Sequence, residues 1–333
     1  DLKQAALTLS DEEARFLVDY YYMQQEDRKR SDMQTRTLAE GDEPHAMVKW
    51  LADNNRILEA NIKRGLDAYT MGRVDGRWCQ SIVGIGPVLT AGLLSNIDIT
   101  KAPTVGHIWA FAGLDPSREW LGAERAKTLV TEVMAGRKQV TAEDVAVVMN
   151  RAGRRNIESF VALATPKPKK DQTDTPEITA ASLASATAKR PWNARLKVLQ
   201  WKVGESFVKT QNLDKDIYGH LMAEYKLRIS EKNDRLEYRE AAEHKLATVK
   251  IGKDTDAYAA YSIGKLPPAH IHSRAKRWAA KLFLAHMHEV MYFAHYNSMP
   301  PKPYVMEKLG HAHIRHAPNP EIVPGLQAAQ EAE

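Results

Sequence analysis

The apolar residues of the chain recur with the period of helices almost throughout. Between residues 46 and 72 they repeat at steps of three and four, which indicates a helix that buries one face. The alternation of apolar and polar residues that marks a half-buried strand is nearly absent. The repeating positions are Val48, Leu51, Asn55, Leu58, Ile62, Leu66 and Tyr69. The pattern predicts an all-α fold.

Capping signals place the first two helices. Ser10 and Glu13 have the spacing of a capping box, so a helix is expected from there to about residue 39. Pro44 follows a turn and suits the first position of a second helix. We interpret residues 1–73 as an antiparallel helical hairpin with a coiled-coil seam, in which Asn55 is the polar member. The hairpin is either a spacer or a dimerisation element.

A glycine-containing step follows the hairpin. Residues 81–94 read Ser-Ile-Val-Gly-Ile-Gly-Pro-Val-Leu-Thr-Ala-Gly-Leu-Leu, which resembles a helix-hairpin-helix turn. Glycines allow a tight turn, and Pro87 suits a helix start whose N–H groups can bind a phosphate without reading bases. Such motifs often carry Lys or Arg where this chain has Val88, so backbone N–H groups would be the main contact. The predicted contacts are Gly84, Ile85, Gly86 and Val88; the alternative is an ordinary helix cap.

The rest of the chain divides by composition. We expect a DNA-binding region over residues 74–122 and a helical insert over 123–188, which ends in a linker rich in Pro and Lys. A basic helical bundle is expected over 189–299. Residues 300–333 are rich in Pro and His and are expected to be extended.

Charge is distributed unevenly. The chain has a net charge of +5, yet residues 1–76 hold 11 Lys and Arg against 15 Asp and Glu, and residues 189–333 hold 23 against 16. Two predicted helices of the second region carry ordered cations, which suit a nucleic-acid backbone. The alternative is a solvated helix face. These cations are Arg195, Lys202 and Lys209 on one helix, and Arg274, Arg277 and Lys281 on the other, where His288 and His295 continue the same spacing.

Several function classes are disfavoured. Cys79 is the only cysteine, so no disulfide framework or thiolate cluster is expected, and a cytoplasmic location follows. Six of the twelve histidines form three pairs near the C-terminus, His270/His272, His286/His288 and His311/His313, and a spacing of two points the rings apart on a helix. No phosphate-binding loop or nucleophile elbow is present. We therefore expect no resident metal or cofactor, and the most apolar helix carries too many polar groups to span a membrane.

These features together resemble a known family. The glycine step from Ile82 to Leu94 and the spacing to Ala112–Pro116 are similar to the C-terminal domain of insertion-sequence transposases of the IS-one-ten group. So is the later stretch Asn193–Lys197, which adds Asn193 and Lys197 to the predicted nucleic-acid contacts. The family usually has Gly-Asn-x-x-Leu-Arg at this place, so Trp192 and Lys197 are departures.

The resemblance extends over about residues 10–122 and 189–295 and includes a closing helix near Ala275–Leu282. Family members join a RuvC-like domain with an acidic DEDD metal site, through a coiled coil, to a domain with a catalytic serine. Too few residues precede Ser10 for that acidic domain, so Mg²⁺ is implied only if a separate domain takes part.

Catalytic residues cannot be assigned from the family motif. The interval that holds the family's serine is filled here by an insert without a Ser-Gly pair, and Ser117 and Ser185 are the weak candidates in it. The leading hypothesis is a nucleoid-associated DNA-binding protein of mobile-element or phage origin. The alternatives are a transposase or recombinase subunit that performs strand transfer, and a coiled-coil scaffold. The family implies a structured guide RNA as a further partner.

Overall fold

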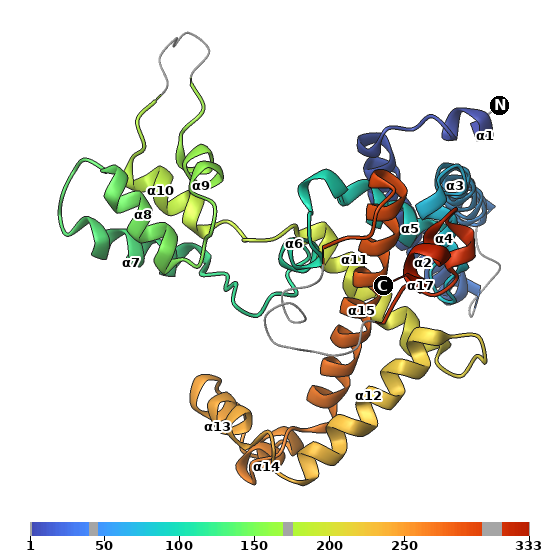
Figure 1. Cartoon of the computed structure of the whole chain (residues 1–333). Coiled ribbons are helices and arrows are strands. Elements are labelled where there is room, and N and C mark those ends of the chain that lie inside the picture. The colour runs from blue at the N-terminus through green and yellow to red at the C-terminus, as the bar shows by residue number, and fades with distance from the viewer. Residues whose placement is uncertain (1, 40–45, 169–175, 302–314, 333) are drawn as a thin grey trace. The chain divides into compact units, whose positions relative to one another are not determined.

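The computed structural model describes residues 2–39, 46–168, 176–301 and 315–332. Every regular element in these ranges is a helix, which confirms the predicted all-α fold (Figure 1). The chain forms two compact units. Unit 1 consists of residues 1–108 and 198–333, and unit 2 of Trp109–Lys197. None of the described helices is long and apolar enough to cross a membrane.

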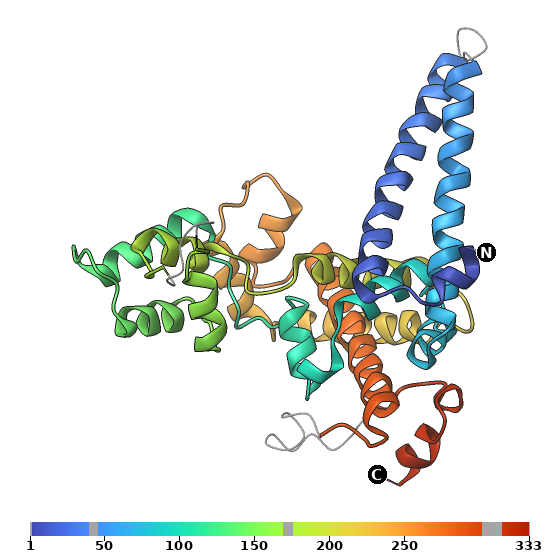
Figure 2. The same ribbon diagram turned by 90° about the horizontal axis from the view of Figure 1, so that it is seen from above.

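Unit 1 starts with a short helix, α1 (Leu2–Ala6), and two long ones, α2 (Asp11–Ala39) and α3 (Ala46–Met71). The Ser10 cap is formed: Glu13 N–H donates to Ser10 Oγ at 3.2 Å, and Ser10 N–H donates to Glu13 Oε2 at 2.8 Å. Figure 2 shows α2 and α3 side by side. Tyr69 donates to Asp11 at the base of the pair, so the helices run antiparallel.

The seam between α2 and α3 changes character along its length. Near the base it is apolar and contains Ala14, Val18, Ile62 and Leu66. Farther out it is polar: Arg28 pairs with Glu59 at 2.5 Å, Arg56 with Asp32 at 2.6 Å, and Asn55 Nδ2 donates to Ser31 Oγ at 2.9 Å. Charged and amide groups therefore hold the outer half of the hairpin.

Two residues of the expected seam are not in it. The side chains of Leu51 and Leu58 are 47% and 38% exposed, whereas Ala52 on the same helix is buried. The helix is turned so that Ala52, Asn55 and Glu59 face α2. The spacing of the apolar residues allowed α3 to pack on α2 through either of two neighbouring faces. The face with Asn55 and Glu59 packs on α2, because its polar groups pair with residues of α2.

Helices α4 (Val74–Ser81) and α5 (Pro87–Asn96) follow the hairpin, then the 3₁₀ turn η1 (Ile99–Lys101) and α6 (Val105–Phe111). Helix α5 is buried on almost every side, against α2, α3 and α4. A Cβ atom at Gly92 would lie 2.9 Å from the side chain of Leu199, so glycine permits this close approach. The helix after the glycine step is thus part of the core.

The centre of unit 1 is aromatic. Helices α11 (Ala194–Thr210), α12 (Ile217–Asp234) and α15 (Pro268–Tyr296) supply Phe207, Tyr218 and Phe283, and α4 supplies Trp78. All four rings are fully buried. Phe207 stacks on Tyr218 with centroids 4.9 Å apart, and Trp78 stacks on Phe283 at 5.8 Å. Helices α13 (Arg239–Thr248) and α14 (Asp256–Ser262) pack on each other between α12 and α15 in the sequence.

The C-terminal segment was expected to be extended, and its described part is partly helical. It contains the turn η2 (Pro320–Ile322) and the helix α17 (Leu326–Glu331), and residues 302–314 lie outside the described ranges. Val323 and Leu326 are buried, and the Trp78 indole N–H donates to Pro318 O at 2.6 Å. The high proline content predicted an extended segment, although Val323 and Leu326 have the spacing of apolar residues on one face of a helix.

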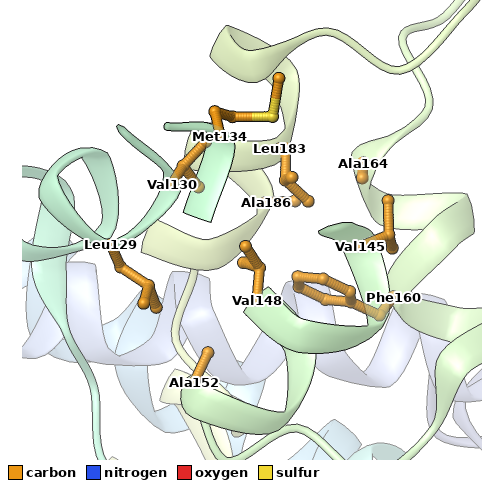
Figure 3. Close-up of a cluster of buried hydrophobic side chains, with 10 residues drawn as sticks. All are labelled: Leu129, Val130, Met134, Val145, Val148, Ala152, Phe160, Ala164, Leu183 and Ala186. Atoms are coloured by element: carbon orange, nitrogen blue, oxygen red, sulfur yellow. The ribbon is translucent and has the colours of Figure 1, made fainter. Parts of the chain in front are cut away.

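Unit 2 has its own core. Helices α7 (Gly122–Met134), α8 (Ala142–Arg151), α9 (Ile157–Ala164) and α10 (Ala180–Ala188) gather around buried side chains that include Val148, Phe160 and Leu183 (Figure 3). A capping box between Thr141 and Asp144 starts α8. The expected linker joins α9 to α10, and its residues 169–175 lie outside the described ranges.

One buried histidine in unit 1 is held in its neutral form. His286 Nδ1 accepts from the Tyr218 hydroxyl at 2.7 Å, and its Nε2 donates to Arg315 O at 2.8 Å. Burial lowers the pKa of His286 to about 4, and the charge of Arg315 adds to this effect. The unfolded chain therefore binds this proton at a higher pH than the folded chain, and stability falls as the pH drops below about 6.5.

We expect unit 1 to lose about 2 kcal/mol of unfolding free energy through His286 between pH 7 and pH 5. Replacement by His286→Gln should flatten that part of the pH dependence in urea unfolding. The control is His295→Gln, because His295 is exposed on the same helix. Equal pH profiles for the parent and His286→Gln would contradict the assignment.

Candidate nucleic-acid interface

The turn between α4 and α5 is fixed to the body of unit 1. Ile82 and Ile85 are 4% and 3% exposed, so two of the three apolar side chains of the turn point into the core, and Val83 is half-buried. Gly84 has a φ of +89°, a conformation that favours glycine. The Ser206 hydroxyl of α11 donates to Gly84 O at 2.5 Å. Glycine at position 84 is therefore a requirement of the turn itself.

Gly86 has a different role from Gly84. It is the N-cap of α5 with φ −94° and ψ 177°, which any residue adopts, and it is exposed. Apart from its chain neighbours Ile85 and Pro87, no described residue has an atom within 4 Å of the place that a Cβ atom would occupy. The next residue, Pro87, takes the first helical position, where its missing N–H is not needed. The turn thus presents bare backbone to solvent at a helix N-terminus.

The four residues predicted to contact nucleic acid at this turn differ in their exposure to solvent. Only Gly86 is exposed, and the side chains of Ile85 and Val88 are buried, Val88 to 7% exposure. A ligand at the turn would meet backbone N–H groups of the first turn of α5, which have no partner within the helix. Ile85 and Val88 can contribute through the backbone alone.

The predicted cations of α11 have unequal surroundings. Arg195 and Lys209 are exposed. The Lys202 ammonium lies 3.8 Å from the centre of the Tyr22 ring, and burial lowers the pKa of Lys202. Lys202 therefore contributes to packing between α11 and α2 as well as to surface charge.

The predicted cations of α15 do not form a continuous stripe. Arg277 is exposed, the Arg274 guanidinium lies 4.6 Å from the centre of the Tyr238 ring, and Lys281 is half-buried. One heptad farther along, His288 is buried and its Nε2 lies 2.8 Å from Ala102 O. The basic face thus ends within the first half of the helix, because the second half crosses the core.

The Asn193 to Lys197 stretch starts α11. Asn193 caps the helix by accepting the Leu196 N–H at 3.1 Å, and its own N–H donates to Phe111 O at 2.9 Å. The Lys197 ammonium lies 3.8 Å from the centre of the Trp192 ring. Both residues have structural contacts within unit 2.

The two serine candidates also differ. Ser185 is exposed on α10. Ser117 is exposed, and its Oγ donates to Asp115 Oδ1 at 2.7 Å and accepts from Arg155 at 3.0 Å. Burial alone would raise the pKa of Asp115, but hydrogen bonds from Ser117 and the charges of Arg155 and Arg118 lower it below its usual value. A carboxylate with a lowered pKa is a weak proton acceptor, so Asp115 is poorly suited to activate Ser117.

Residues 77–133 match the model of the transposase IS116/IS110/IS902 family. We call residues 77–133, which are similar to an IS110-type transposase, the transposase segment. This segment starts in α4, includes the α4–α5 turn, α5 and α6, and ends in α7. No curated protein and no solved structure matches the chain. The family match supports a transposase-related role.

The transposase segment contacts arginines that sequence reasoning missed. Arg118 lies within the segment, and Arg154 and Arg155 follow α8 outside it. Arg155 lies 3.8 Å from Asp115 of the segment, and Arg118 lies 3.6 Å from the same carboxylate. One feature of the sequence could have indicated these cations: Arg154 and Arg155 directly follow Gly153, and no acidic residue lies within two positions of the pair.

Three histidines of the His-x-His pairs lie beside backbone or hydroxyl oxygens. Among the described residues, no group of three or more His, Cys, Asp or Glu side chains is placed to hold a metal ion. His286 and His288 lie near backbone carbonyl oxygens, and His270 Nδ1 lies 2.9 Å from the Tyr261 hydroxyl. His311 and His313 lie outside the described residues.

The two glycines of the turn should respond differently to alanine. We expect Gly84→Ala to lower the unfolding free energy by about 1–3 kcal/mol, because the positive φ strains a side chain and a Cβ atom would lie 2.9 Å from Ser206 Oγ. Gly86→Ala should leave the melting temperature unchanged or slightly raised. Thermal unfolding followed by circular dichroism measures both. A larger decrease for Gly86→Ala than for Gly84→Ala would refute these roles.

Proposed function

We propose that the protein binds duplex DNA through backbone phosphates at the α4–α5 turn, as a protein of mobile-element or phage origin. The observation that carries the proposal is Gly86, which is exposed and open at a helix N-terminus although its neighbours Ile85 and Val88 are buried. The match to a transposase family supports DNA as the partner.

The chemistry of the turn favours phosphate over a base edge. Backbone N–H groups at a helix start attract an anion through their partial positive charge and carry no base-specific pattern. The bare glycine allows a sugar-phosphate backbone to approach closely. Binding of this type depends on salt and little on sequence. It would associate the protein with the nucleoid.

Exposed cations of unit 1 supply the long-range attraction in this proposal. Lys209 and Arg277 are exposed on α11 and α15. Lys202 and Arg274 lie against tyrosine rings and combine charge with packing. We therefore assign the first pair a purely electrostatic role. A structured guide RNA, which the family resemblance implies, would use the same phosphate contacts.

We propose binding and not strand transfer as the function of this chain alone. Ser117 is hydrogen-bonded to Asp115, whose lowered pKa makes it a weak base. Strand transfer would need proton acceptors and the metal site of a DEDD domain, with Mg²⁺ held there. A subunit that carries such a domain would supply that chemistry.

We also propose that the hairpin dimerises the protein. Met47, Trp50, Leu51 and Leu58 are 64%, 57%, 47% and 38% exposed, and their spacing places them on one face of α3. This face is turned away from α2, because α2 contacts Ala52, Asn55 and Glu59. An exposed apolar stripe on a long helix is typical of a helix-to-helix interface.

The first test changes the turn. We expect Gly86→Ala to weaken duplex DNA binding by about tenfold, or about 1.4 kcal/mol, since the methyl group occupies the space that phosphate would enter. Fluorescence anisotropy with a labelled duplex measures the affinity. The matched control is Gly106→Ala, which adds a methyl group at another exposed glycine of unit 1 with only an ordinary contact to Thr104. Unchanged affinity for Gly86→Ala would remove the turn from the interface.

The second test changes the hairpin. We expect Leu58→Glu to convert a dimer into a monomer of 37.4 kDa, because a charge in the stripe repels its copy and reduces apolar burial. Multi-angle light scattering at micromolar concentration gives the mass. Ala60→Glu is the control, since Ala60 is exposed on the same helix but away from the stripe. A monomeric parent protein would leave the hairpin as a spacer.

A further inference from the structure

Unit 2 carries as much net charge as the whole chain. Its residues 109–197 contain 15 Lys and Arg and 10 Asp and Glu, a net charge of +5, so the residues of unit 1 balance to zero. Many acids of unit 2 are used in ion pairs, among them Glu119 with Arg125, Glu132 with Arg151 and Asp144 with Arg137. The excess charge must therefore lie on other side chains of the unit.

Two helix ends bring part of this excess together. Two residues after the end of helix α8, Gly153 has φ +64°, and the Arg154 N–H donates to Met149 O at 2.9 Å. Helix α6 is followed in the same way by Gly113 with φ +67°, and the Leu114 N–H donates to Trp109 O at 2.8 Å. Both are Schellman ends, which turn the chain sharply after the glycine. The segments that leave these ends meet at Ser117 and Arg155.

Three arginines lie near the meeting point, and two of them face the Asp115 carboxylate. Arg155 and Arg118 lie 3.8 Å and 3.6 Å from Asp115. Arg154 donates to the backbone oxygen of Lys189. Burial lowers the pKa of Arg154, and the charge of Arg118 adds to this effect. The positive charge of this arginine cluster (Arg118, Arg154 and Arg155) thus exceeds the negative charge beside it.

One donor of the arginine cluster has an ion-pair partner but no hydrogen bond. The Arg118 Nε atom is buried and lies 3.6 Å from Asp115 Oδ2, and the Nη1 atom donates to Pro191 O at 3.4 Å. Arg155 is exposed, so its guanidinium is open to an oxygen ligand at the cluster. Phosphate oxygens suit guanidinium groups because both can form paired, charge-assisted hydrogen bonds.

An aromatic side chain lies on the same segment as the arginine cluster. Trp120 is 45% exposed, and its indole N–H donates to Ala188 O at 2.7 Å, which fixes the ring. The Arg190 guanidinium lies 4.8 Å from the centre of the ring. A fixed, exposed indole with a cation over it is the type of surface on which unpaired bases stack.

We propose that unit 2 binds single-stranded nucleic acid, with phosphates at the arginine cluster and a base on Trp120. Stacking requires an unpaired base, which favours a single strand over a duplex. The proposal adds a second site to the duplex contact proposed for the α4–α5 turn. The two sites lie in different units and can be tested separately.

The test uses the full chain and labelled oligodeoxythymidylate of about 16 nucleotides, within the range of known single-strand sites. We expect Arg154→Gln/Arg155→Gln to weaken binding at least tenfold. The salt dependence should become shallower by about 0.7 in log–log slope for each phosphate that the variant no longer neutralises. Oligouridylate of equal length identifies whether RNA or DNA binds more tightly at the same site.

The matched control is Arg125→Gln/Arg151→Gln, which removes the same charge from the same unit at arginines paired with Glu119 and Glu132. It should bind like the parent. Arg190→Gln is a second, milder test, because it removes the cation over Trp120 and leaves the arginine cluster in place. We expect Arg190→Gln to weaken binding several-fold with unchanged circular dichroism.

Equal weakening by the two double variants would show that only net charge matters and would overturn the proposal. Parent-like binding by Arg154→Gln/Arg155→Gln would also overturn it. Duplex binding should persist in this variant, and a joint disappearance of duplex and single-strand binding would assign both to one surface. Single-strand binding that survives Gly86→Ala would keep the unit 2 site independent of the proposed turn contact.

Discussion

The fully buried aromatic rings of unit 1 are the constraint on which its other features depend. Trp78, Phe207, Tyr218 and Phe283 come from four helices and lie with centroids 4.9–5.8 Å apart where they contact. Burial of such rings supplies much of the stability of a core. The cluster fixes α4 against α11, and so sets the place where Ser206 holds the carbonyl group of Gly84. The exposed backbone at Gly86 is a consequence of this packing.

The helical period and the capping signals predicted the fold class and located the glycine turn, because both are local properties of the sequence. Nothing local distinguished Gly84 from Gly86. Their difference depends on Ser206, which lies far away in the chain. The same limit applied to Leu51 and His288: the spacing placed Leu51 in the seam and His288 on a basic face, whereas tertiary packing exposes the first and buries the second.

The distribution of net charge over the two folded units differs from its distribution along the sequence. Counting charge by sequence region indicated the C-terminal half as the basic part, but the contact-based units assign the whole excess to unit 2. Paired acids in α2 and α3 balance much of the charge of the hairpin. Three of the cations of unit 2, Arg118, Arg154 and Arg155, lie on segments that follow two glycines in a left-handed conformation. The turns at these glycines therefore set the positions of the three cations. The apolar periodicity of the sequence carries no information about such turns.

The bond from Trp78 to Pro318 joins residues 240 positions apart, and this has a consequence for synthesis on the ribosome. Unit 2 is contiguous in the chain, so its core can close as soon as residue 197 has emerged. Unit 1 must wait for Phe283 and the C-terminal segment, and its first helices meanwhile expose apolar surface to chaperones and proteases. A product that stops short of Pro318 would leave the Trp78 indole without its acceptor. Formation of this contact of α4, next to the α4–α5 turn, therefore waits until Pro318 has been synthesised.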